Sequence, residues 1–207
     1  ADRLRYFQRE LVLNHSRLDE LASELHAAIA YPTDRNLILL VGPTGVGKSA
    51  LLRHVHRKCN AAAGGSNGSP APGGSAYVEL ASPKRGRFDF GDLHMKSLEA
   101  LGAVLPEKSR PLVLREAGTR SLQTLLLERR SPELTARGIE YRFKKEVTGY
   151  QLRAVICDEA RSIFKGSSAA TEIRRMQLLR EQGDVLKDLA NELRTSFVLG
   201  GAYDFFD

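Results

Sequence analysis

The sequence contains no tryptophan and only two cysteines among its 207 residues. Cys59 and Cys157 lie far apart and form no CxxC pair, so we expect reduced thiols rather than a disulfide framework or a cysteine metal site. No apolar run approaches the roughly eighteen residues of a membrane span, and no basic-then-apolar leader opens the chain. These absences predict a cytoplasmic protein that has no membrane partner.

Acidic residues are outnumbered by basic ones. The chain has 31 lysine and arginine residues against 25 aspartate and glutamate residues, which gives a net charge of +6. A basic balance is compatible with DNA or another acidic partner, although charge alone does not separate DNA-binding domains from other basic domains. His54 and His56 lie two residues apart and would face different directions on a helix, which argues against a histidine metal site.

Apolar strands alternate with amphipathic helices along the chain. We predict strands at 36–41, 76–81, 152–157 and 196–199 and helices at 16–31, 48–59, 92–101 and 171–194. The strand at 36–41 is apolar without alternation, so we expect it to be fully buried. This alternation predicts the α/β class, with a mostly parallel sheet that helices cover on both faces.

The chain divides into a short N-terminal part and one core domain. We assign residues 1–35 to an N-terminal segment and helix, and residues 36–207 to the core. Residues 61–75 consist mainly of alanine, glycine, serine and proline, so we expect a flexible surface loop that forms no packed element. The stretch 105–150 is the hardest to interpret, with leucines that suggest a helix and a proline that interrupts it.

A glycine-rich segment joins the first predicted strand to the next helix. It matches G-x-x-x-x-G-K-[ST] at every defined position, and we expect nucleotide contacts from Gly42, Pro43, Thr44, Gly45, Val46, Gly47, Lys48, Ser49 and Ala50. The glycines allow turns that direct backbone N–H groups at phosphate oxygens, and the helix N-terminus adds its positive dipole end. Lys48 suits the β- and γ-phosphates of ATP, and the Ser49 hydroxyl suits Mg²⁺.

Two acids follow the third predicted strand. Asp158 ends the apolar run 154–157, where it is placed to hold Mg²⁺, and Glu159 comes directly after it. A glutamate beside the phosphates can polarise the attacking water, so we assign Glu159 and Lys48 as the catalytic residues of ATP hydrolysis. Taken alone, two acids after a strand would simply favour the start of a helix.

Four segments of the chain carry a resemblance to a known family, although the first two are shared by many ATPases. They are the glycine-rich segment, 155–160, 185–191 and 197–204. This order resembles the transposon-encoded AAA+ ATPases of the TniB/TnsC type, within the P-loop NTPases. The resemblance implies a three-layer AAA+ fold with strand order 5-1-4-3-2, of which this chain would lack the fifth strand and the helical lid.

The resemblance also implies a function and partners. Such a protein is an ATP-hydrolysing regulator that forms a homo-oligomer in its ATP state, assembles on duplex DNA and controls a transposase. The alternative is a nucleotide-gated switch that binds proteins, as in secretion or signalling, and is indifferent to DNA. Hydrolysis by the chain as given is expected to be slow in either case.

Further site residues follow from the resemblance. The family ends its fourth strand with a polar sensor, but here Ala202 occupies that place. Any sensor contact would then come from Tyr203, Asp204 or the backbone, or else the segment is a purely structural turn. Arg174 and Arg175 are candidates for an arginine finger between subunits, or else part of a solvated helix face. The candidates for DNA phosphate contacts are Lys84, Arg85, Arg87, Arg129, Arg130, Lys144 and Lys145.

Overall fold

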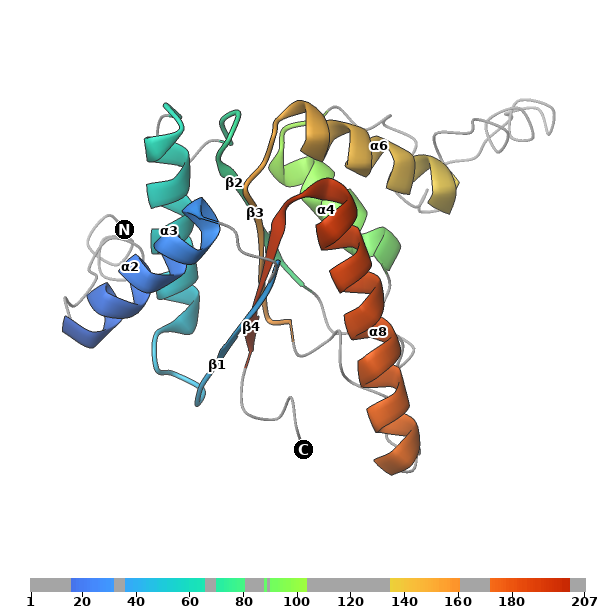
Figure 1. The fold of residues 1–207 in the computed structure, drawn as a ribbon, viewed down its shortest axis with the longest axis horizontal. Helices are drawn as coiled ribbons and strands as arrows, with labels where there is room; N and C mark the ends of the chain where they lie inside the picture. The colour runs from blue at the N-terminus through green and yellow to red at the C-terminus, as the bar shows by residue number, and fades with distance from the viewer. Residues whose placement is uncertain are drawn as a thin grey trace, which may run out of the picture.

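The computed structural model describes residues 16–31, 36–65, 70–80, 88, 90–103, 135–160 and 172–201. In chain order the elements are α2 (Ser16–Ala30), β1 (Leu37–Val41), α3 (Lys48–Ala62), β2 (Ser75–Glu79), α4 (Phe90–Ala100), α6 (Ala136–Gly149), β3 (Ala154–Asp158), α8 (Glu172–Leu193) and β4 (Ser196–Gly201). Figure 1 shows α2 and α3 on one side of the sheet and α4, α6 and α8 on the other. The predicted α/β class, with a sheet covered on both faces, is confirmed.

The four described strands form one parallel sheet in the order β1-β4-β3-β2. This order agrees with the 1-4-3-2 part of the sheet that the family resemblance implies. Strand β4 comes last among them in the chain but lies between β1 and β3. Because all pairs are parallel, the carboxyl ends of the strands meet at one edge, where open α/β sheets bind their ligands.

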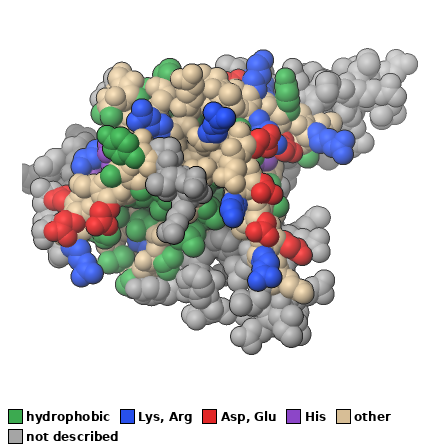
Figure 2. All heavy atoms as spheres, in the orientation of Figure 1, with side chains coloured by type: hydrophobic (Ala, Val, Ile, Leu, Met, Phe, Trp, Pro, Cys, Tyr) green, Lys and Arg blue, Asp and Glu red, His purple; other side chains and the backbone are tan. Residues whose placement is uncertain are grey.

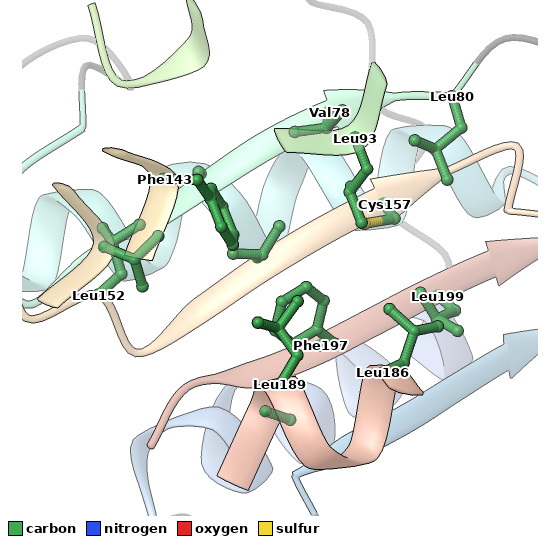
Figure 3. Close-up of a cluster of buried hydrophobic side chains, with 14 of the residues drawn as sticks. Val78, Leu80, Leu93, Phe143, Leu152, Cys157, Leu186, Leu189, Phe197 and Leu199 are labelled. Carbon is green, nitrogen blue, oxygen red and sulfur yellow. The ribbon is translucent and has the colours of Figure 1, made fainter. Parts of the chain in front are cut away.

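One face of the sheet packs against α4, α6 and α8. Its core contains alternate residues of the strands, such as Val155, Cys157 and Phe197, all fully buried. Figure 3 shows Phe143 of α6 and Leu186 of α8 in the same interior as these strand residues. Both cysteines are buried free thiols, and burial raises the pKa of Cys157 to about 12.

The other face packs against α2 and α3. The intervening strand residues, among them Ile156 and Val198, contact Leu52 and Val55 of α3 and Ile29 of α2. Side-chain alternation therefore places Ala154, Ile156 and Asp158 on the α3 side, which is the side of the glycine-rich segment. No described helix is long and apolar enough to cross a membrane.

Strand β1 is less buried than its sequence predicts. All five of its residues are apolar, yet none is fully buried, and Leu39 is 47% exposed. Within the described sheet β1 pairs only with β4, so it occupies an edge rather than the centre. Figure 2 shows hydrophobic side chains over β1, between acidic side chains over α2 and α8. The expectation of a fully buried strand at 36–41 is wrong for the part of the sheet described.

Helix α6 was not predicted from the sequence. Thr135 caps it by accepting a hydrogen bond from Gly138 N at 3.0 Å, and Phe143 and Val147, one turn apart, are its buried residues. Charged residues fill half of the other positions of the helix, so its apolar face is too narrow to stand out in the sequence. The helix suggested by the leucines earlier in 105–150 lies outside the described residues.

Residues 61–75 were expected to form no packed element, and this is wrong at both ends of the segment. Ala61 and Ala62 complete α3, and the buried Asn60 side chain joins the helix to the start of β2. Its Nδ2 donates to Ser75 O at 3.1 Å, and its Oδ1 accepts from Ser75 N at 3.0 Å. Gly74 has to be glycine, because a Cβ there would overlap Asn60 Oδ1. Residues 66–69 are outside the described part.

We predict that Asn60→Ala lowers the free energy of unfolding by about 2–3 kcal/mol, because it leaves buried backbone groups of Ser75 without partners. Urea denaturation measures the change. Asn191→Ala is the matched control, since Asn191 bonds Asn36 at an exposed site, and we expect a change of less than about 0.5 kcal/mol. Equal effects of the two substitutions would contradict the structural role given to Asn60.

Candidate functional site

The glycine-rich segment links the carboxyl end of β1 to the start of α3. Gly45 and Gly47 have φ angles of 85° and 93°, in the left-handed region that glycine adopts at little cost. Gly47 is the N-cap of α3 and provides no side-chain hydrogen bond to the helix. The first backbone N–H groups of a helix need partners from outside it, so this uncapped terminus is suited to an anion.

Lys48 stands in the first turn of α3, where a positive charge opposes the helix dipole. Its Nζ donates to Gly42 O at 2.8 Å and to Pro43 O at 2.7 Å, so the ammonium group lies against the glycine-rich segment. A cation beside uncapped N–H groups is unfavourable unless an anion binds both. The position of Lys48 therefore fits a phosphate ligand.

Asp158 ends β3 and is only 4% exposed. Its Oδ2 accepts a hydrogen bond from the Tyr77 hydroxyl at 2.7 Å, and its Oδ1 accepts one from Glu159 N at 2.9 Å. Burial raises the pKa of Tyr77, and the hydrogen bond to Asp158 raises it further, so the phenol stays protonated and acts as the donor. The carboxylate is thus held at both oxygens.

Glu159 differs from its neighbour in both exposure and backbone. Its side chain is exposed, and its φ of 55° lies in the left-handed region, which is strained for a residue with a Cβ. The turn ends β3 and separates two consecutive acids, one buried and one open to solvent. Their surroundings suit the two roles predicted for them, a metal ligand and a residue that acts on water.

The end of β4 lies between the glycine-rich segment and the two acids. Gly42 N donates to Gly201 O at 3.3 Å, and Ala160 N donates to Gly200 O at 2.8 Å. A Cβ on Gly200 would overlap Leu52 of α3 and would lie 3.6 Å from Asp158 Oδ1. The structure therefore brings the segment at 42–49 and the acids into one site, and a glycine in β4 keeps the space between them open.

The donor set fits Mg²⁺ together with a nucleotide phosphate. Mg²⁺ prefers carboxylate and hydroxyl oxygens and keeps several ligands from water and substrate phosphates. Asp158 supplies a buried carboxylate, and the half-buried Ser49 supplies a hydroxyl in the first turn of α3. In the described parts of the chain no three His, Cys, Asp or Glu side chains gather into a metal-binding group, so a metal that relies on protein ligands alone is not indicated.

Comparison with known proteins agrees with this geometry. The sequence model of a family described as the AAA domain matches residues 32–207, which is most of the chain. The chain belongs to the AAA domain family. Membership supports nucleotide binding and ATPase activity at the level of the family, in agreement with the P-loop NTPase fold. No curated protein matches the chain.

Solved structures also match this AAA domain. One is the Walker-type ATPase PABY2304 of Pyrococcus abyssi, with 19% sequence identity and a TM-score of 0.45. The match covers 93% of this chain and 46% of that protein, so the chain spans less than half of its length.

Several predicted site residues lie outside the described part of the chain. These are the sensor candidates Tyr203 and Asp204 with Ala202, and the predicted DNA contacts Lys84, Arg85, Arg87, Arg129 and Arg130. Arg174 and Arg175 belong to α8, but their side chains are not described. Thr44, Val46 and Ala50 are exposed around the glycine-rich segment, and Lys145 is exposed on α6.

Lys144 does not fit the predicted role as a phosphate contact. Its Nζ lies 2.8 Å from Glu192 Oε2 and 2.9 Å from Glu140 Oε1, so two carboxylates neutralise its charge. The hydrogen bonds to Glu192 and Glu140 raise the pKa of Lys144. It joins α6 to α8, and this pairing argues against a contact with DNA.

Sequence reasoning missed two residues of the site, Tyr77 and Gly200. Tyr77 carries no local signal, since its contact with Asp158 depends on how β2 pairs with β3. Gly200 stands in a predicted strand, where a glycine often marks the close approach of another group, and that signal could have identified it.

We predict that Gly200→Ala lowers the free energy of unfolding by about 1–3 kcal/mol, because the new methyl group overlaps Leu52. Gly183→Ala is the control, since a Cβ at this position of α8 meets nothing within 4 Å, and it should stabilise the protein by roughly 0.5–1 kcal/mol. Urea denaturation of both variants measures these changes. Stabilisation by Gly200→Ala would contradict the packing described.

Proposed function

We propose that this AAA domain binds and hydrolyses ATP and that its nucleotide state controls assembly on duplex DNA. The observation that carries the proposal is the convergence of Lys48, Asp158 and Glu159 at the carboxyl edge of one parallel sheet. Two backbone hydrogen bonds to Gly200 and Gly201 connect the segments that bear them. The arrangement has the parts needed for phosphoryl transfer to water.

Each residue of the site has a role in the proposed reaction. The N–H groups at 45–50 and the Lys48 ammonium group would bind the phosphates, and Ser49 and Asp158 would hold Mg²⁺. When bound, Mg²⁺ neutralises charge on the phosphate oxygens. Glu159, exposed beside the buried Asp158, would orient a water molecule and accept its proton. Glu159 does not have to coordinate the Mg²⁺ ion in this proposal.

We predict that Lys48→Ala abolishes binding of a fluorescent ATP analogue, because the positive charge beside the helix N-terminus is lost. Glu159→Gln should bind the analogue with an affinity within about twofold of the unsubstituted chain. It should release phosphate at roughly one hundredth of the unsubstituted rate or below. Fluorescence titration and a phosphate-release assay give the two readouts.

Lys187→Ala is the control for the loss of one lysine, since Lys187 is exposed on α8. It should bind and hydrolyse ATP as the unsubstituted chain does. Equal binding by Lys48→Ala and Lys187→Ala would contradict the site. Phosphate release by Glu159→Gln at the full rate would remove Glu159 from the reaction.

The distribution of charge supports DNA binding at the end of the molecule opposite the glycine-rich segment. Arg57 and Lys58 are exposed in the last turns of α3, which runs away from that segment. Arg153 is exposed directly before β3, at the amino edge of the sheet, and Lys145 is exposed near the end of α6. Figure 1 shows α6 and the end of α3 at this same end of the molecule. Exposed cations of this kind contact phosphates without reading base sequence.

The proposal includes a transposase partner and a homo-oligomer of this chain. They are supported by the order of the four sequence segments, which resembles the TniB/TnsC type. In those ATPases the nucleotide state governs assembly. The same dependence is proposed for this chain, with ATP favouring the assembled form.

We predict that duplex DNA binding, followed by fluorescence anisotropy, requires ATP and weakens steeply with salt, because phosphate contacts release counterions. The double variant Lys58→Gln and Arg153→Gln should bind DNA about 10-fold more weakly. The slope of its log affinity against log salt concentration should be smaller by about two. Arg180→Gln is the control, since Arg180 is exposed on α8, where the acidic residues Glu181 and Asp184 follow it. It should bind DNA as the unsubstituted chain does.

A chain extended past Asp207 should be measured beside this one. Binding by either chain without nucleotide dependence would contradict control by ATP. No DNA binding by either chain, with ATP binding confirmed, would favour the protein-directed switch instead.

A further inference from the structure

The Tyr77 side chain of β2 reaches Asp158, the buried acid of the site. Its hydroxyl donates to Asp158 Oδ2 at 2.7 Å. The register pairs Tyr77 with Ile156 and Glu79 with Asp158. Asp158 is therefore two residues beyond the direct partner of Tyr77 and on the same face of the sheet, and the phenol extends along the strand to reach its carboxylate. A shorter side chain at this position would not span that distance.

The ring of Tyr77 is held by helix α3. The Arg53 guanidinium lies 5.6 Å from the ring centroid, and its Nη2 lies 3.8 Å from Glu79 Oε2. The His56 ring is tilted against the phenol, with centroids 5.8 Å apart. Arg53 and His56 stand one turn apart on the helix that begins with Lys48. The phenol therefore connects the helix of the phosphate site to the carboxylate at the end of β3.

We infer that Tyr77 is a positioning residue for Mg²⁺ binding, because its hydroxyl fixes the Asp158 carboxylate in the orientation that holds the ion. This inference rests on the proposed function and deepens it. The hydrogen bond from Glu159 N holds the other oxygen, so the two bonds together fix the plane of the carboxylate. Without the phenol, the Asp158 carboxylate would lose one of the two hydrogen bonds that hold it.

A purely structural role for Tyr77 makes a different prediction. A half-buried phenol needs a hydrogen-bond partner in any case, and its loss would then lower stability without changing the response to Mg²⁺. The measurement that separates the two roles is the Mg²⁺ concentration needed for half-maximal binding of a fluorescent ATP analogue. Binding of the same analogue in EDTA reports phosphate contacts that do not involve the ion.

We predict that Tyr77→Phe raises this Mg²⁺ concentration about 10-fold, which is the effect expected from the loss of one hydrogen bond to a charged group. The affinity for the ATP analogue in EDTA should stay within about twofold of that of the unsubstituted chain. Tyr150→Phe is the matched control, since the half-buried Tyr150 hydroxyl donates to Leu101 O at 3.4 Å, away from the acids. It should leave the Mg²⁺ response unchanged. In an Asp158→Asn background, Tyr77→Phe should have no further effect on that response.

The outcomes separate this inference from the proposed function. An unsubstituted chain that shows no Mg²⁺-dependent nucleotide binding would contradict the proposed function itself. If the unsubstituted chain binds nucleotide with normal Mg²⁺ dependence, and Tyr77→Phe needs the same Mg²⁺ concentration as Tyr150→Phe, the positioning role is overturned. Should Tyr77→Phe fail to fold, Arg53→Met tests the same contact by freeing the ring, with an expected rise of roughly threefold. An unchanged Mg²⁺ response in Arg53→Met would then overturn it.

Discussion

The site depends on the insertion of β4 between β1 and β3. The glycine-rich segment follows β1 and the acids follow β3, and they become neighbours only through β4, which bonds Gly42 on one side and Ala160 on the other. Glycine at position 200 makes this possible, because any side chain would occupy the space between Leu52 and Asp158. A contact between backbones, rather than a reactive side chain, thus sets the spacing of the chemical groups.

Three residues of this site depart from local rules of stability, although Gln151 and Arg194, outside the site, share the left-handed backbone of Glu159. Lys48 opposes the dipole of its own helix, Asp158 is a buried carboxylate, and Glu159 has a left-handed backbone. Elsewhere such features lower stability, and in natural proteins they concentrate where a ligand compensates them. Their coincidence supports an anion and a cation as ligands independently of the sequence motif.

The features of the fold and the site that could be predicted from the sequence are those that depend on residues close together in the chain. The segment at 42–49, the α/β class and the buried runs of β3 and β4 depend on neighbouring residues, and all of these elements were predicted. The exposure of β1 depends on its place at the edge of the described sheet, which its own apolar residues do not encode. The contact of Tyr77 with Asp158 depends on strand register, and the neutralisation of Lys144 depends on a glutamate from another helix. Pattern reasoning along one chain has no access to such pairings.

Helix α3 is the element that could connect the nucleotide to DNA. It begins with Lys48 at the phosphate site and bears Arg57 and Lys58 near its other end. Arg53, between these points, and Asn60, just beyond them, bind it to β2, the strand whose Tyr77 contacts Asp158. A rigid helix that is attached to the sheet at several points along its length transmits a displacement along its axis. Energetic coupling between the two ends requires that the helix has two positions and that each ligand favours the same one. If ATP and DNA bind as proposed, their coupling free energy is the same in both directions, so DNA should tighten ATP binding as much as ATP tightens DNA binding.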